Sequence, residues 1–301
     1  MKHLLSLLDL TAEEITELLD LADELKADHK RGIHKPLLAG KTLGMIFQKA
    51  STRTRVSFEV GMYQLGGYAL FLSNRDLQIG RGEPVQDTAR VLSRYLDGIM
   101  IRTFAQKEVE DLAKYGSIPV INGLTDLYHP CQVLADLMTI REYFGKLKGL
   151  KMAFIGDGNN MANTLIVGGL KTGMSISVAC PKNYHPDREA LSFAEGYGDR
   201  FELTDSPEKA AAGADVLVTD VWASMGQEDE KAEREKAFSG FQIDETAMAL
   251  ANRGAIVLHC LPAHRGEEIT EDVFETHAGE IFEEAENRLH AQKAVLVKLL
   301  G

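Results

Sequence analysis

The sequence has little of several features that define other protein classes. Its 301 residues include only three cysteines, Cys131, Cys180 and Cys260, and none of them has C-x-x-C spacing. This argues against a disulfide framework and against a zinc site. No apolar run approaches the roughly eighteen residues of a membrane-spanning helix, and the N-terminal residues lead into a capped helical pattern rather than a secretory signal. We therefore expect a cytoplasmic protein.

Basic residues are also scarce. The chain has 33 Lys and Arg against 45 Asp and Glu, a formal net charge of −12. This balance argues against nucleic acid or an anionic membrane as the main partner. An anionic substrate would therefore need a local basic pocket. The length is sufficient for about two domains with sizeable cores.

Such a pocket is predicted around residues 51–55. An apolar run at residues 43–47 indicates a buried strand, and apolar residues recur at helical spacing from Val56 to Leu65. Free N–H groups and the positive end of a helix dipole meet at such a strand-to-helix corner. The corner itself reads Ser51-Thr52-Arg53-Thr54-Arg55. Two guanidinium groups and several hydroxyls there would bind a phosphate. The alternative is an ordinary N-cap with solvated arginines, although no capping box follows.

Strand and helix patterns alternate along the whole chain, which predicts parallel α/β sheets. The glycine- and lysine-rich residues 145–149 mark a domain junction, so residues 1–144 form one predicted domain. Strands are expected near residues 42–48, 68–72, 98–101, 118–121, 151–155, 175–180, 201–203, 215–219 and 255–259. Helices are expected between them and over 289–300, and the charged residues 228–236 read as a solvated helix face.

Two constellations in the first half add to this corner. Arg102 ends a predicted strand, where ligands of open α/β sheets bind, although a surface arginine is the simpler reading. His129 precedes a helix that begins with Pro130, and Gln132 follows on the same face. His129 can donate a hydrogen bond to a carbonyl oxygen. A histidine before a helix is more often a structural residue.

Two more constellations lie in the second half. Gly156-Asp157-Gly158-Asn159-Asn160-Met161 runs from strand to helix like half a dinucleotide fingerprint, but Met161 replaces the third glycine. The next strand also ends without an acid for the ribose. Asp220 ends another strand and can bind an ammonium group. Cys260 ends a further strand. It has three alternative interpretations: a nucleophile, a polar wall of the site, or a buried hydrophobic residue, which is the usual case.

Taken together, these motifs closely resemble the ornithine carbamoyltransferases. The resemblance spans nearly the whole chain and rests on residues 51–55, Arg102-Thr103, His129-Pro130-Cys131-Gln132, Gly156-Asp157-Gly158-Asn159-Asn160, Asp220, Ser224-Met225-Gly226, His259-Cys260-Leu261-Pro262 and Glu286-Asn287-Arg288. Ser224-Met225-Gly226 marks the ornithine branch and is lacking in the aspartate branch. The implied reaction transfers the carbamoyl group of carbamoyl phosphate to the δ-amine of L-ornithine, giving L-citrulline and phosphate.

The resemblance also implies site residues. Phosphate would be held by Ser51, Thr52, Arg53, Thr54 and Arg102, and Arg102, Thr54 and His129 would face the carbonyl oxygen. Gln132, the carbonyls around Cys260 and Leu261, and Arg288 would complete the carbamoyl pocket. Ornithine would be held by Asn160, Asp220, Ser224 and Met225, with Cys260 near its side chain. Arg102, His129, Asp220 and Cys260 are thus the expected catalytic residues, and neither cofactor nor metal is expected.

The family fold implies two α/β domains, each a parallel sheet flanked by helices. Residues 145–285 would form the ornithine domain, and residues 286–301 would form a helix that returns to the carbamoyl phosphate domain. A homotrimer or a multiple of trimers is implied, with Gln78 from a long polar loop reaching a neighbouring site. Arginine biosynthesis, or arginine breakdown in reverse, is the implied pathway. The alternatives are a related acceptor such as putrescine, a nucleotide-dependent oxidoreductase, or a catalytically silent phosphate-binding protein.

Overall fold

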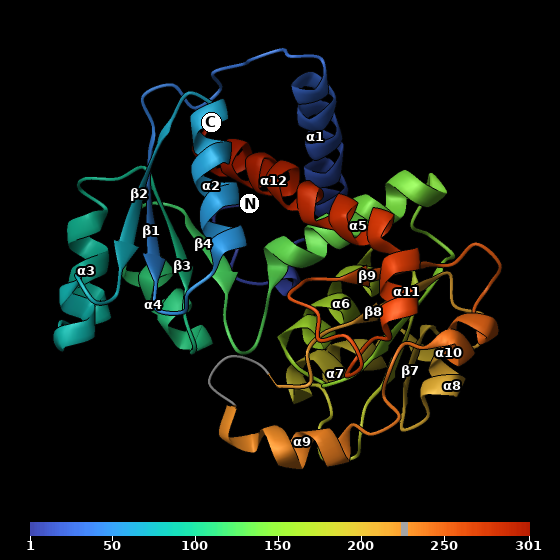
Figure 1. Ribbon diagram of the computed structural model, residues 1–301. Coiled ribbons are helices and arrows are strands. Elements are labelled where there is room, and N and C mark those ends of the chain that lie inside the picture. Colours follow the sequence, from blue (N-terminus) through green and yellow to red (C-terminus); the bar gives the residue numbers. More distant parts are fainter. Residues whose placement is uncertain (224–227) are drawn as a thin grey trace. The chain divides into compact units, whose positions relative to one another are not determined.

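The computed structural model describes residues 1–223 and 228–301 (Figure 1). These residues form two compact units. The first comprises Met1–Leu134 and Asn287–Gly301, and the second comprises Ala135–Glu286. Each unit contains a parallel sheet with helices around it, as expected. No helix in the described part of the chain is long and apolar enough to cross a membrane.

The first unit is built on a four-stranded parallel sheet of order β2-β1-β3-β4. Its strands are β1 (Thr42–Phe47), β2 (Tyr68–Ser73), β3 (Gly98–Arg102) and β4 (Val120–Leu124). The helices are η1 (Leu7–Asp9), α1 (Ala12–Lys30), α2 (Thr52–Gln64), η2 (Gln78–Arg81), α3 (Val85–Leu92), α4 (Gln106–Tyr115) and the first turn of α5 (Pro130–Phe144). Apolar residues of α3 and α4 pack against Ile46, Ile99 and Ile101, so these two helices cover one face of the sheet.

The second unit is built on a five-stranded parallel sheet of order β7-β6-β5-β8-β9. Its strands are β5 (Lys151–Ile155), β6 (Ser175–Ala179), β7 (Phe201–Thr204), β8 (Val216–Thr219) and β9 (Ile256–His259). The helices are the rest of α5, α6 (Asn160–Lys171), α7 (Arg188–Glu195), η3 (Gly198–Arg200), α8 (Pro207–Ala211), η4 (Glu228–Glu230), α9 (Lys231–Ala237), α10 (Glu245–Leu250) and α11 (Glu271–Thr276). In α6, the residues from Asn160 to Leu170 are buried.

The last helix, α12 (Ala278–Leu300), returns to the first unit, which includes its residues from Asn287 onward. Several side-chain contacts attach it there. Lys26 Nζ donates to Asn287 Oδ1 at 2.7 Å, Lys293 Nζ to Gln64 Oε1 at 3.1 Å, and Lys298 Nζ to Glu17 Oε2 at 2.6 Å. The C-terminal helix therefore packs on the first unit, as predicted.

Several elements differ from the prediction. Helix α12 begins at Ala278 rather than near residue 289, because its first turns are charged and lack a long apolar run. Strand β4 lies about two residues later than expected, since Val120 to Gly123 are the buried residues of this segment. The short α11 and η2 escaped prediction because each is less than two turns long.

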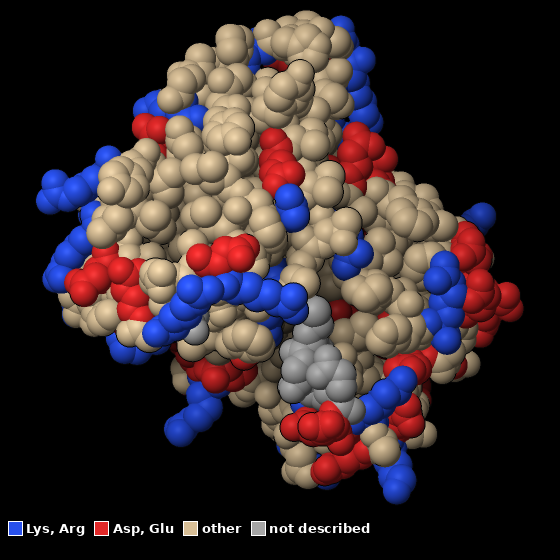
Figure 2. Space-filling model, turned by 60° about the vertical axis from the view of Figure 1, so that its left-hand side comes forward, with Lys and Arg blue, Asp and Glu red and all other residues tan. Residues whose placement is uncertain are grey.

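The surface carries charge of both signs. On the face shown in Figure 2, red Asp and Glu side chains and blue Lys and Arg side chains are interspersed. No strongly basic region is seen on this face among the described residues.

Candidate active site

The strand-to-helix corner lies at the carboxyl edge of the first sheet. Ser51 caps α2, and its Oγ accepts a hydrogen bond from the Thr54 backbone N–H at 3.2 Å. Strand β1 ends at Phe47, which lies in register with Arg102 at the end of β3. The backbone N–H of Gln48 donates to the Arg102 carbonyl at 2.9 Å. The parallel register therefore brings the corner and Arg102 to the same edge, as expected for an open α/β sheet.

His129 lies among the arginines of this unit. It is 4 % exposed, and its pKa is lowered well below the ordinary value by burial and by the positive charges of Arg288, Arg102 and Arg53. At neutral pH the imidazole is therefore neutral. A neutral histidine among fixed positive charges can still donate one hydrogen bond. Gln132, one turn into α5, is fully buried in the same unit.

Arg288 connects the last helix to the corner. Its Nη2 donates to Thr54 Oγ1 at 2.9 Å, and both side chains are buried. Ser51 Oγ lies 3.1 Å from the same Thr54 oxygen. Because a guanidinium group only donates, Thr54 must accept from Arg288, and this fixes the rotamer of its hydroxyl. Of the remaining predicted residues, Thr52 and Gln78 are exposed and begin α2 and η2.

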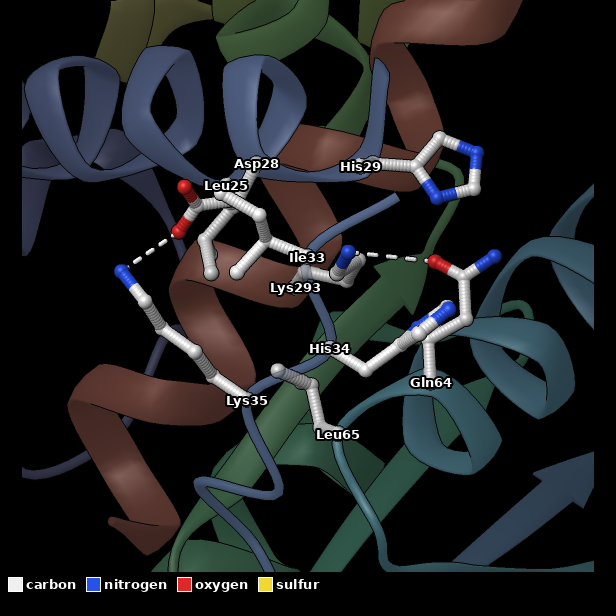
Figure 3. A pocket seen from close by; sticks show the side chains of 9 residues that line it. All are labelled: Leu25, Asp28, His29, Ile33, His34, Lys35, Gln64, Leu65 and Lys293. Carbon is white, nitrogen blue, oxygen red and sulfur yellow. Dashed lines mark hydrogen bonds and ion pairs between the residues drawn. The ribbon is translucent and has the colours of Figure 1, made fainter. Parts of the chain in front are cut away.

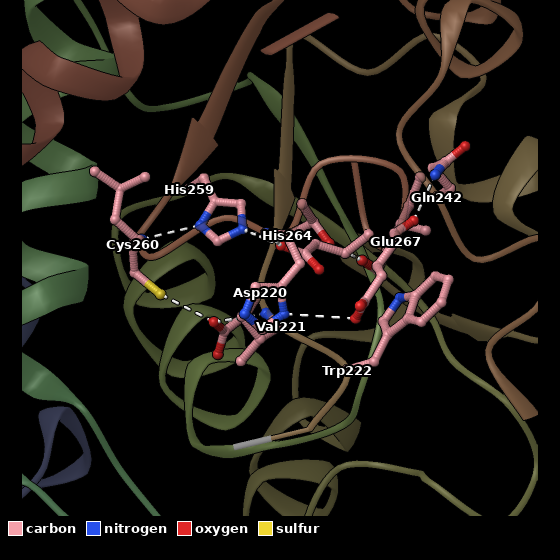
Figure 4. A network of polar contacts seen from close by, with 12 residues as sticks. Asp220, Val221, Trp222, Gln242, His259, Cys260, His264 and Glu267 are labelled. Atoms are coloured by element: carbon pink, nitrogen blue, oxygen red, sulfur yellow. Dashed lines mark hydrogen bonds and ion pairs between the residues drawn. The ribbon is translucent and has the colours of Figure 1, made fainter. Parts of the chain in front are cut away.

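In the second unit, two of the predicted acceptor-side residues, Asp220 and Cys260, lie close together (Figure 4). Asp220 and Cys260 follow the neighbouring strands β8 and β9, and Cys260 Sγ lies 3.1 Å from Asp220 Oδ1. Asn159 Nδ2 donates to Asp220 Oδ2 at 2.8 Å, and the Val221 backbone N–H donates to Oδ1 at 2.8 Å. Asn159, which belongs to the glycine motif singled out in the sequence, also caps α6; the expected substrate-binding residue of this motif was its neighbour Asn160.

The Cys260 thiol is held in its protonated form. Burial and the negative charge of Asp220 raise its pKa well above the ordinary value. A protonated Sγ–H donates to Asp220, which leaves little thiolate for nucleophilic attack. Asn160 begins α6 and is 9 % exposed. Ser224 and Met225 lie outside the described residues.

A hydrogen-bonded relay supports the turn after Cys260. The Leu261 backbone N–H donates to His259 Nδ1 at 2.9 Å, so Nδ1 is unprotonated and the ring proton is on Nε2. That nitrogen donates to Glu268 Oε1 at 2.9 Å, and both side chains are fully buried. The same oxygen accepts from the His264 backbone N–H at 2.6 Å. Leu261 adopts a left-handed φ of 60°, so this relay stabilises a costly backbone conformation.

Glu268 was missed because a glutamate in a charged stretch reads as a surface residue. In the described part of the chain, ligand atoms of His264, Glu267 and Glu268 also come within 4.8 Å of one another, a spacing that metal ligands share. However, Glu268 Oε1 is already used by the relay, and Glu267 pairs with Lys231 at 3.2 Å. These contacts explain the cluster as part of the protein framework.

The glycine motif after β5 has a packing role. A Cβ atom on Gly158 would lie 2.3 Å from the backbone of His185 and of Pro186, so no other residue fits there. The Gly158 backbone N–H donates to the Tyr184 carbonyl at 2.9 Å. Close approach of this chain segment therefore accounts for the glycine that resembled a nucleotide fingerprint.

Arg234 corrects the prediction for residues 228–236, because it is not part of a fully solvated face. It is 6 % exposed, and its Nη1 donates to Asp157 Oδ2 at 2.8 Å and to the Trp222 carbonyl at 2.9 Å. Burial raises the pKa of Asp157 to about 6, while the Arg234 charge acts in the opposite direction. Arg234 thereby attaches α9 to the residues that follow Asp220, a contact that no helical pattern reveals.

A parallel α/β unit with arginines near its strand ends, together with a second parallel α/β unit that has a buried carboxylate, is typical of enzymes that act on small charged molecules. Residues 2–142 match the carbamoyl-P binding domain of the aspartate/ornithine carbamoyltransferases, and residues 148–299 match their Asp/Orn binding domain. The chain belongs to the aspartate/ornithine carbamoyltransferase family.

Individual relatives are similar over their full length. An ornithine carbamoyltransferase of Carboxydothermus hydrogenoformans is 57% identical over 304 aligned residues, which cover 100% of this chain and 98% of that protein. A solved structure of ornithine carbamoyltransferase from Pyrococcus furiosus has a TM-score of 0.95 and 53% identity, covering 100% of this chain and 97% of that one. The anabolic ornithine carbamoyltransferase of Campylobacter jejuni has a TM-score of 0.93 and 48% identity, with 99% of each chain covered.

Proposed function

We infer that this chain transfers the carbamoyl group of carbamoyl phosphate to the δ-amine of L-ornithine, giving L-citrulline and phosphate. The observation that carries this inference is the gathering of Arg53, Arg102 and Arg288 around the neutral His129, in a unit that matches a carbamoyl-P binding domain. The match of the second unit to an Asp/Orn binding domain supports the acceptor side. Full-length relatives named ornithine carbamoyltransferase favour ornithine over putrescine.

The proposed phosphate ligands are Ser51, Thr52, Arg53, Thr54 and Arg102. Backbone N–H groups at the start of α2 and the helix dipole add to their attraction for a dianion. Phosphate is already a good leaving group, so the protein mainly needs to hold it in place. Positioning and electrostatic stabilisation are therefore the expected contributions of this corner.

As the amine attacks, negative charge develops on the carbonyl oxygen. Arg102, Thr54 and the neutral His129 are the proposed donors to this oxygen, while Gln132, Arg288 and the carbonyls at Cys260 and Leu261 hold the carbamoyl amide. One preorganised donor of this kind typically contributes on the order of 3 kcal/mol to transition-state stabilisation. Because burial and the arginines keep His129 neutral, it acts by donating a hydrogen bond rather than as a cation.

The acceptor amine must react in its neutral form. With a reference pKa of ~10.4, only about one amine in a thousand is neutral near pH 7.4, a cost of roughly 4 kcal/mol. Asp220, with Cys260 and Asn160 nearby, is the proposed binding group for ornithine, together with Ser224 and Met225. The high pKa of the Cys260 thiol argues against a covalent carbamoyl-cysteine intermediate.

We further propose a homotrimer, or a multiple of trimers. Strand β2 is the edge of the first sheet, and exposed apolar or aromatic side chains lie on it and on the adjoining α2. They are Val56, Tyr63, Tyr68 and Phe71. Such a face favours association with a second copy of the chain. Gln78 is proposed to reach a neighbouring subunit's site. We propose that the chain is a cytoplasmic enzyme of arginine biosynthesis, as the anabolic relative of Campylobacter jejuni suggests.

An assay of the purified protein tests the function directly. Carbamoyl phosphate is supplied with ornithine, putrescine, acetylornithine or aspartate, and both phosphate release and the carbamoylated product are measured. Ornithine should be preferred by at least tenfold in kcat/KM. A preference for putrescine would reassign the acceptor, and no turnover with any amine would leave only a phosphate-binding role.

A further inference from the structure

A second basic pocket lies in the first unit, apart from the phosphate corner. It is a hollow, open to solvent, between the end of α1, the segment after it, the end of α2 and the middle of α12 (Figure 3). Its lining residues are Leu25, Asp28, His29, Ile33, His34, Lys35, Gln64, Leu65 and Lys293.

Lys293 is the unusual residue of this pocket. It is 4 % exposed, and its Nζ donates to the neutral amide oxygen of Gln64 at 3.1 Å. None of the ion pairs between described residues joins Lys293 to a carboxylate. Asp28, the acid that lines the pocket, is instead paired with Arg31 at 2.7 Å and Lys35 at 2.5 Å. A buried ammonium group whose nearby carboxylate is already paired with two other cations is only partly compensated, and an anion would offset the remaining cost.

The surroundings of Lys293 are positive as a whole. His290 lies one turn earlier on α12, and its ring is 5.7 Å from that of His29. The pKa of His290 is lowered to about 3 by burial and by the charges of Lys293, Lys26, His29 and Lys30. Burial also lowers the pKa of Lys293, and Asp28 is the charge that opposes this. Cations therefore gather here in a chain whose net charge is −12.

We propose that this pocket binds a small inorganic anion, such as phosphate, sulfate or chloride. Lys293 would supply the buried charge, and His29 and His34 would supply further donors at the mouth. The hydrogen bond from Lys293 to Gln64 would remain, because an ammonium group has three donors.

The position of the pocket suggests what a bound anion would do. Helix α2 has the phosphate corner at its first turn and Gln64 at its last residue. Helix α12 supplies Arg288 to Thr54 and Lys293 to the pocket. An anion would therefore hold together the same two helices that build the corner. The expected result is a more stable first unit, whether or not the carbamoyl transfer proposed above is correct.

The test uses the full chain with the substitution Arg53→Ala, which weakens anion binding at the corner. Thermal unfolding midpoints are measured against phosphate, sulfate and chloride at constant ionic strength. In this background, Lys293→Gln should raise the apparent Kd for the anion by at least tenfold. Lys298→Gln should leave it unchanged, because Lys298 is a half-exposed lysine of the same helix. The tightest of the three anions identifies the preferred ligand.

Nuclear magnetic resonance of the histidine-labelled protein provides a local readout that does not depend on any substitution of Lys293. His29 and His34 resonances should shift on addition of the tightest-binding anion with the same apparent Kd. Equal responses of Lys293→Gln and Lys298→Gln would overturn the proposal, as would histidine signals that stay in place during saturation. If Lys293→Gln does not fold, the histidine titration alone decides.

Discussion

Arg288 donates a hydrogen bond to Thr54 at 2.9 Å, although 234 residues separate them in the chain. This contact joins the last helix to the first turn of α2, where the phosphate ligands are proposed. Because Thr54 and Arg288 are both buried, loss of the acceptor would leave a guanidinium donor unsatisfied.

Thr54→Val should therefore weaken carbamoyl phosphate binding by about tenfold, or ~1.4 kcal/mol. Valine keeps the shape of threonine but cannot accept from Arg288. Thr54→Ser, which keeps the hydroxyl, should stay within about threefold of the unmodified protein. Calorimetric titration with carbamoyl phosphate measures both values. Equal affinity of the valine and serine variants would show that the hydroxyl has no part in the corner.

Cys260 should act as a thiol rather than as a nucleophile, because burial and Asp220 raise its pKa. Cys260→Ser retains a donor to Asp220 and should keep measurable activity, with weaker ornithine binding or slower turnover. Cys260→Ala removes the donor and should be more impaired. Mass spectrometry during turnover should find no carbamoylated Cys260, and detection of that adduct would establish covalent catalysis instead.

Glu268 should position the turn at Leu261 through His259. Glu268→Ala is expected to lower kcat by at least tenfold, while KM for ornithine changes by less than about threefold, since the turn is proposed to hold the carbamoyl group. Glu268→Gln retains an acceptor for His259 and should recover part of the loss. Glu275→Gln, an exposed glutamate bound to Arg265, serves as the control. A loss confined to KM for ornithine would place the relay on the other substrate.

His290 should make the protein less stable in mild acid. The pKa of His290 is about 3 in the folded protein and near ~6.5 in the unfolded chain. Its contribution to the free energy of unfolding is therefore complete above pH ~6.5 and is lost as the pH falls from there toward 3. Between pH 7 and 5 this amounts to about 2 kcal/mol. His290→Gln should lose correspondingly less free energy of unfolding over that interval, as measured with urea. The exposed His264→Gln is the control, and parallel pH slopes for all three proteins would contradict the argument.

The proposed contribution of Gln78 to a neighbouring site predicts complementation. Arg53→Ala and Gln78→Ala should each impair every site of a pure trimer. In mixed cyclic trimers, one interface pairs an intact Arg53 with an intact Gln78. With random mixing in equal amounts, three quarters of trimers are mixed, so roughly a quarter of unmodified sites should return. Activity equal to the average of the two parents, with subunit exchange demonstrated, would assign Gln78 to its own chain.

Local patterns in the sequence determined where most elements lie. Thr11 and Glu14 form the capping box that starts α1, and apolar periodicity placed the strands of both sheets within a few residues. These signals are reliable because they depend on neighbours in the chain, through capping hydrogen bonds and alternating burial. The corner at Ser51 followed from the same logic, since a strand followed by a capped helix leaves N–H groups free at one known point.

Only the tertiary structure decided which charged and polar residues are buried and which partners they have. Nothing in the local sequence distinguishes Arg234, Glu268 or Lys293 from surface residues, yet each is buried. The capping residue Asn159 contacts Asp220 through the fold, and Arg288 reaches Thr54 through the return of α12. A charged side chain can be buried only where distant segments supply donors, acceptors or counter-charges, and that supply is a property of the packed chain.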